Sequence, residues 1–167
     1  MRSAPPVILL ASLLAVSVFA AAGAGCGTVT ADVGYAAPVD GQPTGGRAAV
    51  DLRVSTGGLV AFGVAAHSTF ASNLQTVAFS PELTVGVEPG GVYVGARGGV
   101  RLLQLERYDD DWSVASLSPY GGPLVGFPVN DHVRFVLSAT AEYERHGGAP
   151  ERDGLLLGGE AGVALHF

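Results

Sequence analysis

One stretch of the sequence, HSTF, places a possible general base next to hydroxyl nucleophiles. His67 is followed directly by Ser68 and Thr69, and an imidazole can activate a hydroxyl group when the two are within hydrogen-bond reach. The residues around them alternate as in a β-strand, where successive side chains point to opposite faces. His67 and Ser68 would then point apart, so this pattern predicts a polar strand end, and we expect no catalytic residues.

The sequence contains few residues with the spacing of a metal or cofactor site. Three consecutive aspartates at 109–111 offer the oxygen ligands that calcium prefers, but the Gly-punctuated spacing of a calcium loop does not follow them. His132, His146 and His166 have no spacing suited to a single metal site. We therefore expect no metal and no cofactor, and we interpret the aspartates as a solvated loop.

Charged residues of both signs occupy the polar faces of the alternating segments, among many glycines. Charges enclosed in a protein must be paired, and small residues suit the narrow interior of a barrel. Four carboxylates and four arginines can pair in this way, which predicts a polar, salt-bridged interior. The expected interior charges are Asp51, Arg53, Glu82, Arg97, Arg101, Arg134, Glu142 and Glu160.

The elements that carry these charges have a period of two. In HVRFVLSATAEYE, for example, Val133, Phe135 and Leu137 share one face and Arg134 lies on the other. Long and short connections alternate along the chain, which favours an all-β, eight-stranded antiparallel up-and-down transmembrane β-barrel with short turns at one end. The eight expected strands cover 28–36, 47–55, 58–67, 74–88, 91–106, 112–127, 131–145 and 154–167.

The sixth expected strand contains two prolines. Pro119 and Pro123 each lack the N–H group that a paired strand donates. We therefore expect a bulge or a break near 120–122.

Composition and the N-terminus point to an exported protein. The chain has 167 residues, is 48% hydrophobic and only 14% charged, and all its basic side chains are Arg. Its net charge of -6, with no basic patch, argues against nucleic acid as a partner. An apolar run after Arg2 predicts a signal peptide over 1–25, followed by a barrel domain over 26–167.

Cys26, the single cysteine, follows a lipobox-like GAG and is a candidate for lipidation. Ordinary signal cleavage, which would leave a free thiol, is the alternative. One cysteine excludes an intrachain disulfide.

Alternation alone does not say which face points inward. A soluble or lipid-anchored lipocalin-like barrel that binds a small apolar ligand would have its apolar face inside. The small and charged residues of the polar faces favour the opposite arrangement, as does the collection of aromatic residues toward both expected ends of the strands. These aromatic residues are Tyr35, Phe70, Tyr108, Trp112 and Tyr143 toward one end, and Phe127 and Phe167 at the other.

On strand number, loop alternation and the C-terminal pattern EAGVALHF, the chain resembles the small eight-stranded outer-membrane barrels, such as the OmpA transmembrane domain and OmpX. The resemblance implies a location among outer-membrane lipids and a structural or surface-interaction role. Phe167 resembles the terminal signal read by the barrel assembly machinery. The loops at 37–46, 107–111 and 146–153 would contact a partner that the sequence does not identify.

The resemblance also raises lipid A modification as a further hypothesis. Lipid A deacylases of this barrel class use a His and a Ser spaced one apart near the end of the chain. Here His67 and Ser68 are adjacent and lie early in the chain, so the motif departs from the pattern.

Overall fold

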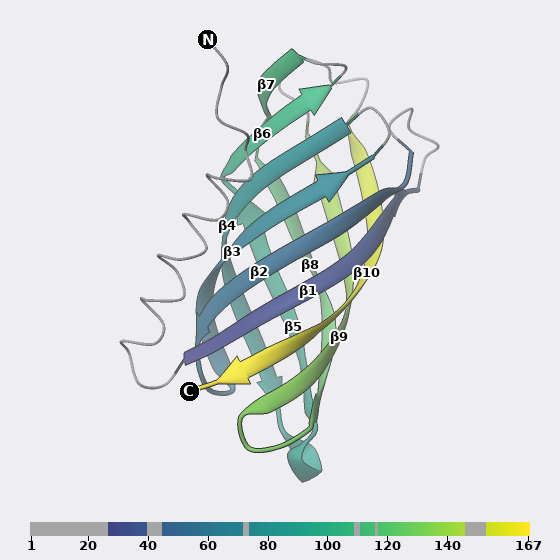
Figure 1. Cartoon of the computed structure of the whole chain (residues 1–167). Helices are drawn as coiled ribbons and strands as arrows, with labels where there is room; N and C mark the ends of the chain where they lie inside the picture. The colour runs from purple at the N-terminus through teal and green to yellow at the C-terminus, as the bar shows by residue number, and fades with distance from the viewer. Residues whose placement is uncertain (1–26, 40–44, 72–73, 109–110, 116, 146–152) are drawn as a thin grey trace.

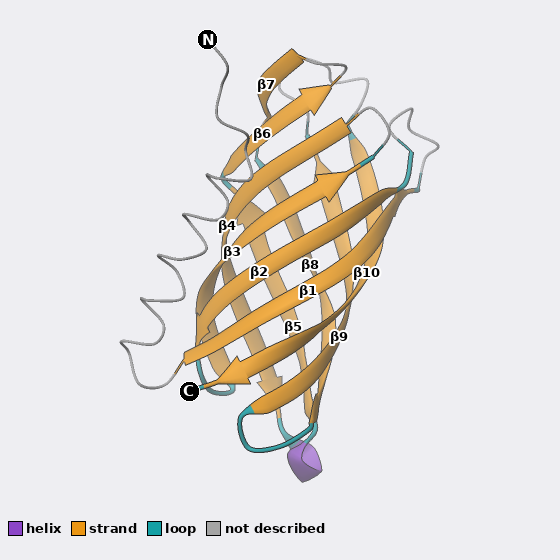
Figure 2. Ribbon diagram, in the orientation of Figure 1, coloured by secondary structure: helices purple, strands orange, loops and turns teal. Residues whose placement is uncertain are grey.

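A computed structural model describes residues 27–39, 45–71, 74–108, 111–115, 117–145 and 153–167. The signal-peptide segment and Cys26 lie outside these residues. Within them no helix has the length and apolar character needed to cross a membrane. The described chain is almost entirely β-strand, with one 3-10 turn, η1 (Pro89–Gly91), between two strands (Figure 2). The strands are β1 (Gly27–Pro38), β2 (Arg47–Thr56), β3 (Val60–Phe70), β4 (Leu74–Val87), β5 (Tyr93–Arg101), β6 (Leu103–Tyr108), β7 (Asp111–Ala115), β8 (Ser118–Pro128), β9 (Val133–Glu144) and β10 (Gly154–His166).

The strands close into a barrel of eight antiparallel members, as predicted. Neighbours pair in the order β1-β2-β3-β4-β5-β8-β9-β10, and β10 pairs back with β1. The segment β6 continues β5 and pairs with the same neighbour, β4, while β7 precedes β8 and pairs with β6. Figure 1 shows β6 and β7 extending the barrel at one end, and the start of β1 beside the C-terminus at the other.

We call the two ends by their connections. The short-turn end carries the β2–β3, β4–β5 and β8–β9 turns, and the long-loop end carries the β1–β2, β3–β4, β6–β7 and β9–β10 connections. Phe167 donates its backbone N–H to the Gly27 carbonyl oxygen at 3.0 Å, so both ends of the described barrel meet at the short-turn end.

A one-residue bulge divides the fifth strand. Phe79 of β4 lies opposite Leu103, and Glu82 lies opposite Gly99. Two residues of β4 therefore face three residues of the fifth strand, and Leu102 is the extra one. The alternation changes phase at this point, so that Gln104 becomes buried although the regular pattern over 91–106 predicted one unbroken strand.

The bulge or break expected near 120–122 is present only as a gap in the pairing of this strand with one neighbour. β8 runs without interruption through 120–122, and the strand is divided between β7 and β8 instead. The pairing of β8 with β9 keeps one register, from Gly121 opposite Ala141 to Leu124 opposite Ser138, but skips Gly122 and Pro123. The missing N–H of Pro123 thus interrupts the ladder to one neighbour without inserting a bulge.

The apolar faces of the strands point outward. Val33 and Phe62 are 63% and 65% exposed, and large apolar side chains on every long strand behave alike. Charged and small side chains point inward. This arrangement is opposite to that of a soluble lipocalin-like barrel, and it matches a barrel whose outer surface contacts lipid.

Candidate functional site

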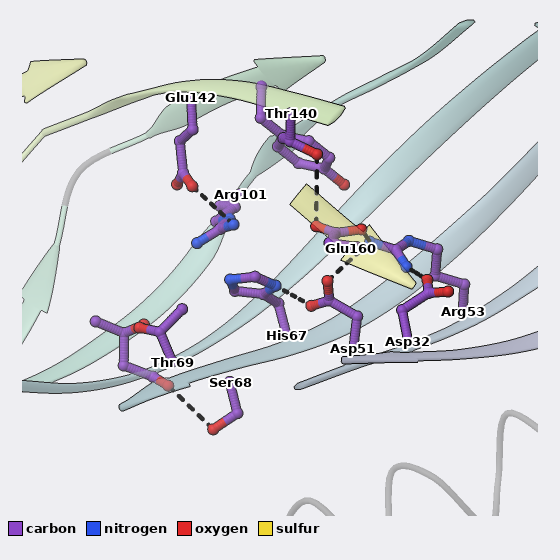
Figure 3. A network of polar contacts seen from close by, with 12 residues as sticks. Asp32, Asp51, Arg53, His67, Ser68, Thr69, Arg101, Thr140, Glu142 and Glu160 are labelled. Carbon is purple, nitrogen blue, oxygen red and sulfur yellow. Dashed lines mark hydrogen bonds and ion pairs between the residues drawn. The ribbon is translucent and has the colours of Figure 1, made fainter. Parts of the chain in front are cut away.

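Arg53 lies at the centre of the barrel interior and contacts four carboxylates from four strands. Its guanidinium is ion-paired with Asp32 and lies 2.8 Å from Asp51, 3.1 Å from Glu82 and 2.9 Å from Glu160. These residues come from β1, β2, β4 and β10, and Figure 3 shows Asp32, Asp51 and Glu160 around Arg53. One side chain therefore links strands that are far apart in the sequence.

Arg97 of β5 reaches three of these four carboxylates, Asp32, Glu82 and Glu160. Its Nη2 donates to Glu160 at 2.6 Å and to the Ser138 hydroxyl at 3.2 Å. Its other nitrogens lie 3.8 Å from Asp32 and from Glu82, beyond hydrogen-bond distance. We call Asp32, Asp51, Arg53, Glu82, Arg97 and Glu160 the central cluster.

A second layer of ion pairs lies toward the long-loop end. Arg101 is 2.8 Å from Glu142, and Arg47 is 2.5 Å from Glu144. The Arg47 and Glu144 side chains are only 1% and 0% exposed. A cavity of about 20 Å³ remains between these residues and the central cluster, which is room for about one water molecule.

A larger cavity occupies the short-turn half of the barrel interior. It measures about 300 Å³ and ends on Arg53, Glu82 and Arg97 of the central cluster. Its wall carries a cluster of buried apolar residues that face inward rather than toward lipid. This apolar wall consists of Tyr93, Leu124, Val136 and Ala164.

The residues expected inside the barrel occupy three positions along its axis. Five of the eight belong to the central cluster, and Arg101 and Glu142 form a pair closer to the long-loop end. Arg134 is ion-paired with Glu88 near the short-turn end, where the two side chains are 18% and 39% exposed. The seven residues that line the deeper interior are Asp51, Arg53, Glu82, Arg97, Arg101, Glu142 and Glu160. Glu160 accepts hydrogen bonds from Arg53 and Arg97.

Several interior residues were missed from the sequence. Asp32 lies two residues after Thr30 on the face of β1 that turns inward, so the alternation would have found it. Arg47 and Glu144 stand at the ends of expected strands, where alternation is a weak guide. Gln104 and Glu106 are buried as a consequence of the Leu102 bulge, for which the sequence carries no clear signal.

The possible nucleophiles and base at 67–69 are not brought together. His67 contacts Asp51 through Nδ1, whereas the Ser68 hydroxyl donates to the Thr76 carbonyl oxygen at 3.2 Å. The Thr69 hydroxyl lies 2.5 Å from that of Thr76. Figure 3 shows His67 and Ser68 pointing in different directions. Among the described side chains, these contacts form no nucleophile–base pair.

The other chemically interesting residues are also separated. His166 is hydrogen-bonded to the Thr28 hydroxyl at 2.8 Å, and His132 lies in an exposed turn. His146, Asp109 and Asp110 lie outside the described residues. Within the described part of the chain, no group of three or more His, Cys, Asp or Glu residues could hold a metal ion.

The aromatic residues near the strand ends point outward where their side chains are described. Tyr35, Phe70 and Tyr143 are exposed toward the long-loop end, and Phe127 and Phe167 are exposed at the short-turn end. This is the distribution expected for two aromatic girdles.

Comparison with known proteins shows the fold. No protein-family model and no curated protein matches the chain. It is similar to the crystal structure of Neisserial surface protein A (NspA), with 16% identity and a TM-score of 0.61 over 84% of this chain and 97% of that one. A de novo designed transmembrane β-barrel also matches, with 16% identity and a TM-score of 0.48 over 86% of this chain and 96% of the design.

Proposed function

We propose that the protein is a bacterial outer-membrane β-barrel with a structural or surface-interaction role and without catalytic activity. The observation that carries this proposal is the continuous apolar outer surface of a closed barrel. Soluble monomers rarely expose large contiguous apolar surfaces, and only closed barrels or helices satisfy all backbone groups within lipid. The likeness of the fold to NspA supports the same conclusion.

The interior ion pairs are proposed to act as a plug. The central cluster and the pairs beyond it fill the interior from its middle toward the long-loop end, and the space between them is about 20 Å³. The interior of an eight-stranded barrel is just wide enough for side chains to fill. We expect the purified protein to show no stable conductance in a planar lipid bilayer, whereas sustained single-channel currents would contradict the plug.

The N-terminal and C-terminal signals belong to the same proposal. Residues 1–25 would direct export and Cys26 would be lipidated, both outside the described residues. Phe167 would form the end of the signal that the barrel assembly machinery reads, since its side chain is exposed at the short-turn end. Deletion of Phe167 should lower the amount of barrel assembled in the membrane. Mass spectrometry of the mature N-terminus would distinguish a lipidated Cys26 from a free thiol.

Surface interaction would occur through the loops at the long-loop end. The β6–β7 extension carries one of them beyond the barrel (Figure 1). Binding residues often lie on loops held by a rigid scaffold, but the fold itself does not identify the partner.

Membrane fractionation and heat-modifiable gel migration test the proposal together. We expect the protein in the outer-membrane fraction, soluble only in detergent, and we expect unboiled samples to migrate differently from boiled ones. Recovery from wash fractions without detergent would contradict membrane insertion. For the enzymatic alternative, His67→Ala and Ser68→Ala should leave the lipid A profile unchanged, and an altered profile would argue for catalysis.

A further inference from the structure

The 300 Å³ cavity in the short-turn half has the size of a small-molecule site. Pockets that bind small ligands begin at about this volume. The inner end of the cavity, its floor, is formed by Arg53, Glu82 and Arg97, and its other lining residues, including Thr56 and Leu59, extend to the β2–β3 turn. A ligand would therefore enter from the short-turn end and stop at the central cluster.

One side of this cavity is an apolar wall, whereas the rest of its lining is mainly hydroxyl-bearing, small and charged residues. Leu124 and Val136, from neighbouring strands, are each 8% exposed and face inward beside Ala164. The side chains adjacent to them in sequence, Val125 and Leu137, face outward. An apolar molecular body resting on this wall would remove its surface from water, which is favourable.

The floor of the cavity offers a hydrogen-bond donor and an acceptor side by side. Arg97 is only 7% exposed, and its Nε and Nη1 make contacts no shorter than 3.8 Å with carboxylates of the described chain. Glu82 is one of those carboxylates and also lines the cavity. A hydroxyl group placed between them would accept from Arg97 and donate to the Glu82 carboxylate. The Oε1 atom of that carboxylate also accepts from Arg53 at 3.1 Å and from the Tyr120 hydroxyl at 2.6 Å.

The charges around the floor disfavour an ionised head group. The central cluster holds four carboxylates, Asp32, Asp51, Glu82 and Glu160, against the two guanidiniums of Arg53 and Arg97. The guanidiniums that line the cavity are already ion-paired, Arg53 with Glu82, Arg97 with Glu160 and Arg134 with Glu88. An ionised head group would therefore meet counter-charges that are already paired, and it would lose its hydration on entry.

We propose that this cavity is a binding site for a small uncharged amphipathic alcohol, with its hydroxyl between Arg97 and Glu82 and its apolar body on Leu124 and Val136. The site requires only the closed barrel, so it goes beyond the proposed outer-membrane role and does not depend on it.

Three probes that share an apolar phenylalkyl group and differ in their head group test the proposal. They are 3-phenylpropanol, 3-phenylpropionate and 3-phenylpropylammonium, each titrated into the purified protein in lipid nanodiscs. Methyl NMR would follow Leu124 and Val136, which face the cavity, and Val125 and Leu137, which face lipid. The lipid-facing methyls report partition of the probe into the bilayer, so each strand contains its own control.

We expect saturable shifts of the Leu124 and Val136 methyls with the alcohol, and binding about tenfold weaker with either charged analogue. Absence of saturable shifts at these methyls would overturn the proposal. Equal shifts of inward and outward methyls would also overturn it, since they would mean bilayer partition alone. Equally tight binding of a charged analogue would contradict the assigned head group.

Two alanine substitutions on one strand provide a second measurement. Ala61 lines the cavity, and Ala66 on the same strand lies outside it. Ala61→Leu should abolish the saturable shifts and Ala66→Leu should retain them. Retained binding in a folded Ala61→Leu protein would overturn the proposal, and the comparison of head groups on the unmodified protein decides it if that variant does not fold.

Discussion

The two halves of the barrel interior are built from the same alternation but differ in how they are filled. Toward the long-loop end, Arg47, Glu144, Arg101 and Glu142 form buried ion pairs and leave a cavity of about 20 Å³. Toward the short-turn end, small and apolar residues leave about 300 Å³. The central cluster around Arg53 separates the two regions.

This difference shows that inward-facing positions do not all serve one purpose. Long charged side chains at the long-loop end fill the interior and link strands, at the cost of removing charges from water. Shorter side chains at the short-turn end leave space that a ligand can enter. The outward faces of both halves are alike, so the difference arises from the interior positions alone.

The largest expected effect comes from the boundary between the halves. Arg53→Leu removes the guanidinium that contacts four carboxylates and leaves them crowded in a buried site. We expect the free energy of unfolding to fall by at least about 3–5 kcal/mol, the cost of breaking a buried pair. Urea unfolding in nanodiscs or detergent would measure it.

Val54→Leu provides the control for Arg53→Leu, because Val54 is the next residue along the strand and faces outward. It should change the unfolding free energy by less than about 0.5 kcal/mol. If the two variants were equally stable, the central cluster would not be a stabilising junction between the halves.

The next effect concerns the filled half. Arg101→Leu leaves the buried Glu142 carboxylate without its ion-pair partner. The two groups lie 2.8 Å apart, and both side chains are about nine-tenths buried or more. We expect the free energy of unfolding to fall by about 3 kcal/mol. Replacing both residues, as Arg101→Leu with Glu142→Leu, removes the stranded charge. A double-mutant cycle should therefore show that the double variant is more stable than Arg101→Leu alone. Additive losses would mean that the two side chains act independently.

These pairings mark the limit of what the sequence could predict. Period-two alternation identified eight strands and the inward faces, because in a strand each position maps to one face. It carried no information on which carboxylate meets Arg53, since that depends on the register between β1, β2, β4 and β10. The Leu102 bulge reversed the phase locally, and the uneven filling of the interior depends on side-chain reach across the barrel.

A smaller effect on stability is expected when a larger side chain is introduced into each half of the interior. Ala49 lines the 20 Å³ cavity and Ala61 lines the 300 Å³ cavity. Ala49→Leu should destabilise the barrel by about 1–3 kcal/mol through overpacking, whereas Ala61→Leu should cost less than about 1 kcal/mol. Parallel unfolding measurements on the two variants would test this. Equal losses would contradict the difference in filling between the two halves.

The smallest effect is expected at the rim of the short-turn half, where Arg134 pairs with Glu88. Their side chains are 18% and 39% exposed, so water screens the interaction and little desolvation is recovered when it breaks. Glu88→Gln should lower the unfolding free energy by less than about 1 kcal/mol, and added salt should reduce the difference further. Urea unfolding at low and high salt measures both quantities. A loss as large as that of Arg101→Leu would show that the rim is as strongly coupled as the filled half, and the two halves would then differ in volume but not in their electrostatics.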